Sequence, residues 1–456
     1  MATRLRIVLI AVVVVLAAYT GAAWLIGLKV QGQLEAREQQ ILQSVPYVVL
    51  IRRDYHRGIF GATEEATYGL KFPLGRLSQA LPAGGTSPSL QLTLRNTIYH
   101  GPLPRFRSIA LATVDTEFVA PPALGAKLKA IFGDRPPIAI HSSLGWLGGT
   151  KAEFSSPGFQ MPLPTGGTLT SRGLTGSVEM TRDSASWTGH FTSGGVDVQG
   201  PRGSLDIGNF TLDENMRRAF DTIYVGDGQA SLASVDVRGA SGAPFLMKGL
   251  SISSSAKADS EYVNYDVRVV ADQVSGGTYS FTHVVYAIRI LHLDGSALAS
   301  LVNAIRQAEA NSAPADAAAV RANINGALSQ YGVELLVHDP VIHIQSLAFA
   351  MPEGEFHLAA SLEAHGIRRG DLAGGMASML ALTQHLDVTA DLKIDAALLS
   401  KLVGSSAQGP MLSAQLDSLE KQGYLKRDGA AWTAQLAFHG GKLTINGQAY
   451  PPLPSQ

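Results

Sequence analysis

The densest group of reactive side chains in this sequence is Asp54-Tyr55-His56-Arg57. A histidine beside an aspartate is the pairing that general-base catalysis uses, because the carboxylate orients the imidazole. If the segment is a strand, however, Asp54 and His56 share one face while Tyr55 and Arg57 share the other. We therefore interpret the segment as a charged edge with one aromatic contact near a membrane.

The other motifs also lack the partners that a reaction needs. His338 and His343 flank Asp339-Pro340, a spacing with no known metal geometry. Ser254-x-x-Lys257 and Ser418-x-x-Lys421 have no accompanying Lys-Thr-Gly or Ser-Asp-Asn motif. Gly226-Asp227-Gly228 lacks a third glycine and a following helix, so we interpret it as a turn. We predict no catalytic, cofactor-binding or metal-binding residue, and no enzymatic activity.

A long apolar segment precedes all of these motifs. Residues Ile7–Leu28 carry no charge, and at about 1.5 Å per helical residue they reach roughly 33 Å, enough to cross a hydrocarbon core. Arg4 and Arg6 lie before the segment with no acidic residue among them, which favours a cytoplasmic N-terminus. We predict a single transmembrane anchor that delivers everything after Lys29 to the other side.

A cleavable signal peptide is the alternative interpretation of the same segment. Gly21-Ala22-Ala23 has the small residues of a cleavage site. Trp24-Leu25-Ile26 continues the apolar run past that site, which favours a retained anchor. Both interpretations export the bulk of the protein.

Composition excludes several functions. The chain has no cysteine, so a disulfide scaffold, a thiolate nucleophile, a cysteine zinc site and an iron–sulfur cluster are all excluded. A net charge of −1 gives no electrostatic footprint for nucleic acid. The charged fraction of 16% is low against roughly 25% in ordinary soluble domains. Either the surface is neutral but polar, or extra apolar surface is covered by a partner, a lipid or a second copy.

Alternation with period two dominates the sequence after Tyr47 and predicts strands with one buried and one solvated face. Turns containing Gly or Asp divide these segments, as in Ser193-Gly194-Gly195, Gly226-Asp227-Gly228, Gly276-Gly277, Pro352-Glu353-Gly354 and Asp428-Gly429. The fold class is therefore α+β and β-dominated: an elongated, curved antiparallel meander sheet with a few short helices. The clearest alternating segments are 89–94, 231–238, 265–269, 355–359 and 441–447.

Helical patterns interrupt the strands at a few places. We predict a juxtamembrane helix over Val30–Leu42, ended by Pro46, and a helix pair whose second member stops at Gly332. The other predicted helices, including that pair, cover 123–132, 297–308, 315–330, 372–384 and 410–422.

A strand leads into an aspartate and then into a helix-like pattern three times, at Asp213, Asp294 and Asp395. An aspartate at such a position accepts hydrogen bonds from the first helical turn, so we predict an N-cap at each. The recurrence indicates repeated strand-to-helix units.

Two predicted strands, Val284–Ile288 and Leu347–Met351, are apolar on both faces. They need cover on two sides, and the predicted helices are short and few. We therefore expect an incompletely covered sheet with an apolar concavity. Along the chain we expect a tail and anchor (1–28), a juxtamembrane stalk (29–46) and two β-rich parts (47–240 and 241–456).

Three segments together resemble a known family. They are 53–60 after the anchor, 340–344 after the helix pair, and 440–447 near the end. The sequence resembles the YdgA-like family of bacterial envelope proteins, a domain of unknown function, and is more distantly similar to the AsmA-like proteins. The family resemblance implies an anchor in the bacterial inner membrane, a large periplasmic β-rich part and no established activity; the AsmA-like similarity implies a groove for lipid.

We accordingly expect a non-enzymatic, single-pass inner-membrane protein whose periplasmic part is a binding or structural module of the envelope. One alternative is a groove for lipid or acyl chains of the AsmA-like kind. A second is an envelope hydrolase without recognisable motifs. We expect the membrane as a partner, together with a lipid, a protein or a second copy forming a homodimer, and no cofactor or nucleic acid.

Overall fold

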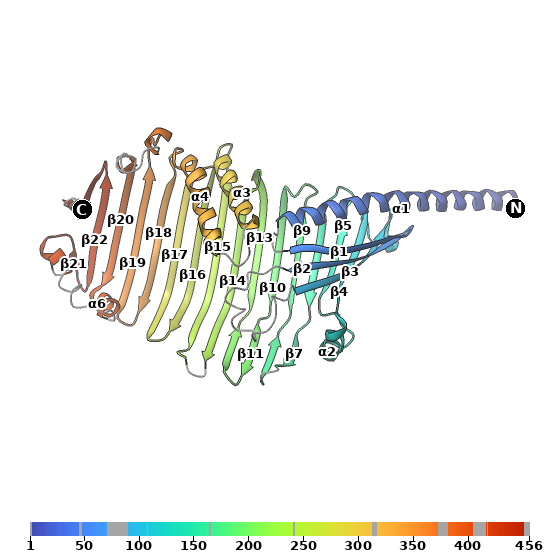
Figure 1. Ribbon diagram of the computed structural model, residues 1–456, viewed down its shortest axis with the longest axis horizontal. Helices are drawn as coiled ribbons and strands as arrows, with labels where there is room; N and C mark the ends of the chain where they lie inside the picture. The colour runs from blue at the N-terminus through green and yellow to red at the C-terminus, as the bar shows by residue number, and fades with distance from the viewer. Residues whose placement is uncertain are drawn as a thin grey trace. The chain divides into compact units, whose positions relative to one another are not determined.

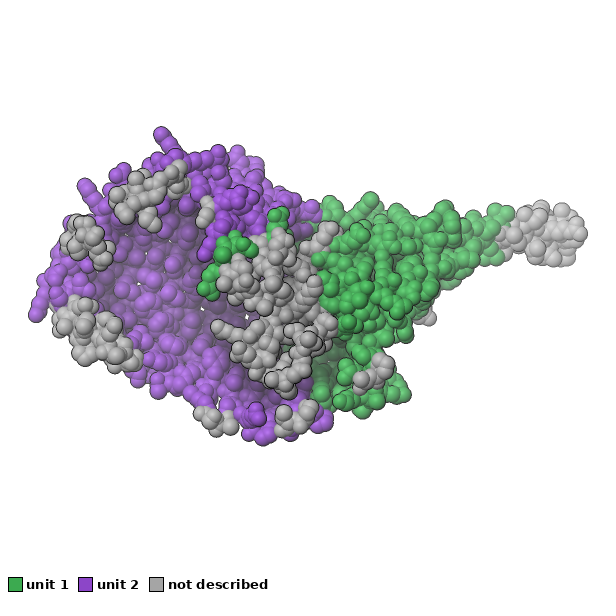
Figure 2. Space-filling model, in the orientation of Figure 1, with its two compact units in different colours: residues 1–161, 170–193, 306–323 green, residues 162–169, 194–305, 324–456 purple. Residues whose placement is uncertain are grey.

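The computed structural model describes residues 2–44, 48–70, 90–106, 108–163, 166–239, 242–311, 317–372, 382–404, 416 and 418–450. It is 57% strand and 23% helix, its strands pair antiparallel, and an apolar helix begins the chain. The predicted fold class, β-dominated α+β with short helices, is confirmed. The chain divides into two compact units, coloured separately in Figure 2: unit 1 (1–161, 170–193, 306–323) and unit 2 (162–169, 194–305, 324–456).

Unit 1 combines a long helix with a meander. Its strands follow the order β1-β2-β3-β4-β5-β6-β9-β10. The short strands β7 (Phe159–Pro162) and β8 (Thr168–Ser171) have residues in both units. The elements of unit 1 are α1 (Ala2–Ser44), β1 (Val48–Arg57), β2 (Gly61–Leu70), β3 (Leu90–His100), the 3-10 turn η2 (Pro104–Phe106), β4 (Ala112–Val119), α2 (Pro122–Phe132), β5 (Ala139–Leu144), β6 (Thr150–Ser156), β9 (Leu174–Met180) and β10 (Ser186–Ser193).

The second half of α1 packs on this meander (Figure 1). Ala23, Gly27 and Val30 are buried, a spacing that places them on one side of a helix. Val30 joins a core with Ile98 of β3 and Leu111. The helix predicted over Val30–Leu42 is thus continuous with the anchor in one helix of 43 residues, and it lies against a sheet rather than forming a free stalk.

Unit 2 is a longer meander in which most strands pair with their sequence neighbours. The helices α3 (Gly295–Asn311) and α4 (Ala317–Leu336) connect β17 to β18, and their facing ends, 306–323, are grouped with unit 1. The remaining elements are β11 (Val196–Gly200), β12 (Gly203–Ile207), β13 (Phe210–Phe220), β14 (Ile223–Gly239), β15 (Phe245–Ala258), β16 (Tyr262–Gly276), β17 (Tyr279–Asp294), β18 (Val341–Met351), β19 (Gly354–Ala364), η3 (Arg369–Leu372), β20 (Leu386–Asp395), α6 (Ala396–Gly404), β21 (Lys426–Asp428), β22 (Ala431–His439), β23 (Lys442–Ile445) and β24 (Gln448–Ala449).

Two helices cover parts of the unit 2 sheet. Ala299 of α3 packs with Val225 of β14 and Val263 of β16. Leu398 of α6 is fully buried against β20 and Trp432 of β22. These are the two clusters of buried apolar residues in the described part of unit 2, and single buried residues such as Ala271, Ala364 and Ile367 lie outside them.

One of the three predicted strand-to-helix caps is confirmed. The Asp294 carboxylate accepts a hydrogen bond from the Ala297 N–H at 2.7 Å, at the start of α3. Asp395 does precede α6, but its carboxylate accepts from the Glu355 N–H at 2.8 Å instead, because β19 begins beside it. No helix follows Asp213: β13 runs straight through it, so this prediction is wrong.

Two glycine predictions are also wrong. Gly226-Asp227-Gly228 lies inside β14 rather than in a turn. At Gly226, φ is +148°, and an added Cβ would lie 1.9 Å from the Asn215 carbonyl oxygen, so glycine serves a close strand approach there. The helix predicted to stop at Gly332 continues to Leu336, since a helical glycine costs only about 1 kcal/mol.

Several other predictions of turns and helices agree with the structure. The turns at 193–195, 276–277, 352–354 and 428–429 all separate strands as predicted, and the helix at 123–132 is α2. The helix predicted over 372–384 lies mostly outside the described residues, as does much of 410–422, of which 416 and 418–421 are helical. The boundary predicted at 240/241 also falls outside them and stays a prediction.

His100 at the end of β3 joins the meander of unit 1 to α1. It is 2% exposed, its Nδ1 lies 3.1 Å from the Ala23 carbonyl oxygen, and an added Cβ on Gly27 would lie 2.5 Å from its ring. Burial lowers the pKa of His100, so the folded protein holds the ring neutral while the unfolded chain takes up a proton near pH 6.5.

The lowered pKa of His100 predicts acid-sensitive docking of α1. The free energy of unfolding should be fully developed above pH 6.5 and should fall as the pH drops below it, because the unfolded state then binds the additional proton. Hydrogen exchange of amides 22–34 in the full chain, measured between pH 7 and pH 5, checks this. A His100→Gln variant should lose most of the pH dependence; an unchanged pH dependence in that variant would contradict the assignment.

Candidate functional site: an apolar face on unit 2

A row of apolar side chains crosses unit 2 from strand to strand. Each residue of the row is the direct partner of the next, and directly paired residues in a sheet point to the same face. The row passes through nine strands, β13 to β20 and β22. Its members are Leu212, Ala230, Ile252, Val269, Tyr286, Leu347, Leu358, Leu392 and Ala434.

Two further rows on the same face extend this surface. Both contain apolar residues throughout, and both lie two residues or more along each strand from the first row. One runs Ala256, Tyr265, Ile290, Ile342, Leu362, Val388, Phe438 and Leu443. The other runs Val267, Ile288, Ile344, Ala360, Ala390, Leu436 and Ile445. We call the three rows together the apolar face.

The opposite face of the same strands is polar. Ser255, Asp266, Arg289, His343, Ser361 and Thr389 form one continuous row there. Within it, Arg289 Nε lies 2.6 Å from an Asp266 carboxylate oxygen. Alternation along each strand thus gives the two sides of unit 2 opposite character.

The apolar face stays partly open to solvent. None of the nine residues in the first row is fully buried, and Ile252 is 36% exposed. Helix α3 covers part of β13 to β16, and α6 covers the end near Trp432. Figure 1 shows α3 in front of these strands, and Figure 2 shows unit 2 hollowed on the same side. The strands at 284–288 and 347–351 are therefore not sandwiched by the described helices.

The apparent two-faced apolarity of those strands has a simple structural basis. Tyr286 and Leu347 carry bulk on the apolar face. On the polar side Ala287 and Ala348 are small, and Val285 is the larger apolar residue. Small residues need little cover. Bulges between 282 and 285 in β17 and between 344 and 347 in β18 restore the pairing of apolar with apolar residues. The sequence pattern did not predict these bulges.

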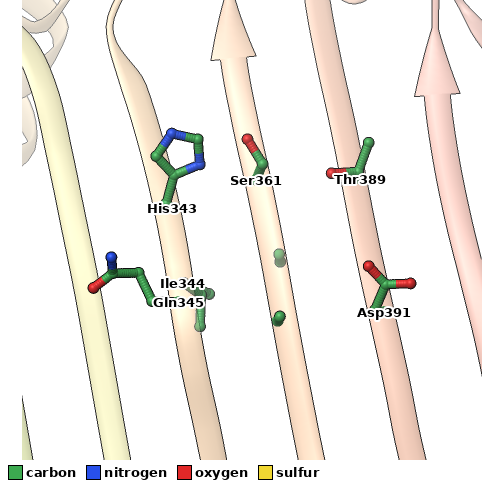
Figure 3. Close-up of a pocket in the computed structure, with 8 residues that line it drawn as sticks. His343, Ile344, Gln345, Ser361, Thr389 and Asp391 are labelled. Carbon is green, nitrogen blue, oxygen red and sulfur yellow. The ribbon is translucent and has the colours of Figure 1, made fainter.

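A shallow depression of about 280 Å³ lies on the polar face. His343, Gln345, Ser361, Thr389 and Asp391 point into it, and Ile344 points to the other side (Figure 3). The Ser361 hydroxyl donates to the Glu363 carboxylate at 3.2 Å rather than to His343. The depression therefore lacks the hydrogen-bonded nucleophile and base that hydrolysis uses.

The remaining sequence candidates are dispersed. His56 Nε2 lies 3.2 Å from Asp54, but their side chains are 77% and 44% exposed, as expected for a charged strand edge. His338 Nε2 lies 3.8 Å from the Asp294 carboxylate and does not line the depression that holds His343.

Neither Ser-x-x-Lys match forms a reactive pair. Ser254 and Lys257 lie three residues apart in β15, so they point to opposite faces. The Ser418 hydroxyl oxygen accepts from the Gln422 amide at 2.8 Å. Among the described residues, no three His, Asp or Glu side chains are grouped to hold a metal ion.

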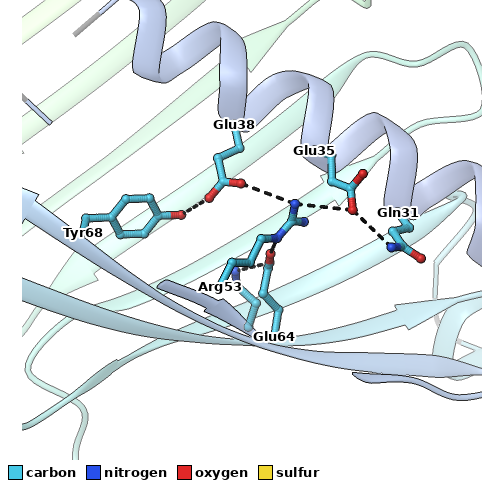
Figure 4. A network of polar contacts seen from close by, with 7 residues as sticks. Gln31, Glu35, Glu38, Arg53, Glu64 and Tyr68 are labelled. Atoms are coloured by element: carbon cyan, nitrogen blue, oxygen red, sulfur yellow. Dashed lines mark hydrogen bonds and ion pairs between the residues drawn. The ribbon is translucent and has the colours of Figure 1, made fainter. Parts of the chain in front are cut away.

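A cluster of polar side chains joins α1 to β1 and β2 (Figure 4). Arg53 forms ion pairs with Glu64 and, at 3.4 and 3.5 Å, with Glu35 and Glu38 of α1. The Tyr68 hydroxyl donates to Glu38 at 2.6 Å, and burial raises the pKa of this phenol. Glu64 is 6% exposed. A single, partly buried cation thus holds three carboxylates, and the cluster ties α1 to β1 and β2.

Comparison with known proteins gives the family. A family model described as bacterial protein of unknown function (DUF945) matches residues 4–452, and the chain belongs to this family. No curated protein and no solved structure matches the chain. The YdgA-like name and the AsmA-like similarity stay predictions. Of the described residues, one helical stretch, Val14–Gln39, is long and apolar enough to cross a membrane.

Removing the central cation should release α1 from the sheet. In Arg53→Met the buried Glu64 loses its ion pair, which typically costs about 3–5 kcal/mol. Hydrogen exchange of amides 30–44 in the full chain should accelerate by roughly 100-fold. The adjacent Arg52→Met is the control: its side chain is 73% exposed, and it should change stability by less than about 0.5 kcal/mol. Equal exchange in both variants would refute this role of Arg53.

Proposed function

We propose that this protein is a non-enzymatic, single-pass inner-membrane protein whose exported part binds acyl chains of envelope lipids on the apolar face. The observation that carries the proposal is the unbroken apolar row from Leu212 to Ala434. Nine strands at about 4.8 Å spacing give it a length of roughly 38 Å. That length exceeds the hydrocarbon thickness of a bilayer, about 30 Å.

The chemistry of the apolar face favours an acyl chain over a protein segment. The three rows contain no charged residue, and apart from the hydroxyl groups of Tyr265 and Tyr286 they offer no polar side-chain atom. A protein segment laid on this face would lose hydration of its backbone amides without gaining partners, because the strands' own amides are paired within the sheet. A hydrocarbon chain has no such cost and gains about 0.8 kcal/mol per buried methylene.

A helix able to enter a membrane supports the same proposal. Val14–Gln39 has the length and composition of a membrane span, so the protein would work where acyl chains are supplied. A purely structural module with a homodimer interface is the rival, because the same apolar face would suit a second copy. The hydrolase alternative is less well supported, since the polar depression has no paired nucleophile.

Neighbouring residues of β15 provide a matched test of lipid binding. Ile252 lies on the apolar face and is exposed, while Ser253 is exposed on the polar face and pairs with Arg268. Ile252→Glu places a charge among acyl chains and should lower the lipid retained by the purified full chain at least about tenfold, measured by mass spectrometry. Ser253→Glu should retain the wild-type amount.

The outcomes separate the candidate functions. Equal lipid retention by the two variants would refute the acyl-chain proposal. A wild-type protein that carries no lipid and is dimeric, with Ile252→Glu monomeric, would favour the homodimer instead.

The membrane topology has its own test. The cationic Arg4 and Arg6 before the apolar segment predict a cytoplasmic N-terminus. A C-terminal alkaline phosphatase fusion should be active and a C-terminal cytoplasmic reporter silent. Sequencing of the mature N-terminus should find residues ahead of Gly21; a chain beginning near Trp24 would show that the segment is cleaved.

A further inference from the structure

The sheet of unit 1 reaches α1 before the apolar segment ends. Side chains from Val14 to Ala18 are exposed on all sides, and protection of the helix begins at Tyr19. The Tyr19 hydroxyl donates to the Leu103 carbonyl at 3.3 Å, and its ring stacks on Phe106 with centroids 5.7 Å apart. The β3–β4 loop is therefore in place against α1 at Tyr19.

The uncharged segment before Tyr19 is by itself too short to cross a bilayer. Ile7 to Ala18 is about 12 residues, which span roughly 18 Å, against a hydrocarbon core of about 30 Å. The uncharged segment is long enough to cross the bilayer only if it is embedded as far as about Leu28. Lys29 is the first charged residue after it. Leu25 and Leu28 are 61% and 43% exposed on the side of α1 away from the sheet, so that side remains apolar to the same point. Trp24, which is 46% exposed, lies at the edge of that side, beside Arg57 of β1.

The loops beside this stretch are themselves apolar and exposed. Ile59 and Phe60 of the β1–β2 turn are 50% and 49% exposed. Leu103, Phe106 and Ile109 of the β3–β4 loop are 42%, 78% and 86% exposed. We call these five residues the rim. Residues 58–60 and 101–111 contain two arginines and no acidic residue, a composition that suits lipid phosphates beside a hydrocarbon region.

Contacts with Tyr19 and Trp24 place the rim beside the part of α1 that the proposed anchor embeds in the membrane. Phe60 packs on Tyr19 with ring centroids 6.1 Å apart, and Arg57 lies 5.6 Å from the Trp24 ring centre. If the bilayer reaches Leu28, it must also surround the loops packed against Tyr19 to Trp24. We propose that the rim is immersed in the leaflet next to the folded part, so that unit 1 is seated in the lipid rather than held above it. This inference rests on the membrane anchor of the proposed function.

The surroundings of the rim favour lipid over a second copy or another protein as its cover. The rim is continuous with an uncharged helix surface that itself needs a bilayer, and the immersed length of α1 reaches a full span only when the rim is submerged. A single occupant, the lipid leaflet, satisfies both surfaces at once.

The absence of cysteine allows single labels on the full chain. Four variants, Leu16→Cys, Phe106→Cys, Ile109→Cys and Leu147→Cys, are each labelled with an environment-sensitive fluorophore and placed in vesicles of phosphatidylethanolamine and phosphatidylglycerol. Leu16 is 59% exposed on the anchor. Leu147 is the matched control: it is 90% exposed, but its loop is held at Arg37, which donates to the Gly148 carbonyl at 2.9 Å, beyond Lys29.

Two sets of vesicles carry the nitroxide either near the glycerol end or near the methyl end of the acyl chain. At least one of the two should lower emission at Leu16, Phe106 and Ile109, and both should leave Leu147 unchanged. Adding Phe106→Asp to the Ile109→Cys variant should restore its emission, because a carboxylate draws the loop into water. Quenching at 16 alone would overturn the seated rim while the anchor stands. No quenching at 16 would overturn the anchor itself. Quenching at 147 as well, or a blue shift at 106 without quenching, would also overturn the rim, the latter in favour of a protein partner.

Discussion

Antiparallel pairing that keeps apolar residues opposite apolar residues is the constraint on which unit 2 depends. From β13 to β22 every step of the row from Leu212 to Ala434 matches one apolar side chain with the next. A slip of one residue in any strand would turn its apolar set to the polar side, so each register reinforces its neighbours. The bulges in β17 and β18 keep this matching where the strands would otherwise drift out of phase.

The same constraint explains the unusual composition. Helices that covered the whole apolar face would have to supply a second layer of apolar residues to pack against it. The described helices supply only small cores around Ala299 and Leu398. The low charge then has two sources. The apolar face holds many uncharged residues, and the polar face uses neutral serines such as Ser251, Ser253 and Ser255 beside a few ion pairs. The neutral polar surface is thus one source of the 16% charged fraction, and the cover of the apolar face by a lipid, a protein or a second copy stays a prediction.

Local patterns predicted the strands, most turns and the class of fold, because alternation with period two can be recognised from residues that are adjacent in the sequence. Errors arose where a long-range contact decided the outcome. Gly226 has the sequence surroundings of a turn, yet its backbone lies against Asn215 in a continuous strand. Asp395 has the position of a cap, yet β19 provides a better placed N–H. The apolar concavity was expected from the strands at 284–288 and 347–351, whereas the pairing of its rows and the Arg53 cluster depend on registers that no local pattern contains.

With the proposed anchor in a bilayer, helix α1 would contact lipid first and the sheet of unit 1 after it, and this order constrains the whole of unit 1. Between Tyr19 and Leu28 one side of the helix contacts protein while the other carries Leu25 and Leu28 toward the outside. Beyond Lys29 the side facing the sheet combines the apolar Val30 and Leu34 with Glu35 and Glu38, which pair with the partly buried Arg53. A carboxylate in hydrocarbon is costly, so this cluster must lie beyond the lipid. The positions of the charged residues along α1 therefore limit how deep the helix can lie in lipid. Because contacts from Tyr19 to Glu38 hold α1 against the sheet, the same limit applies to the strands packed on it.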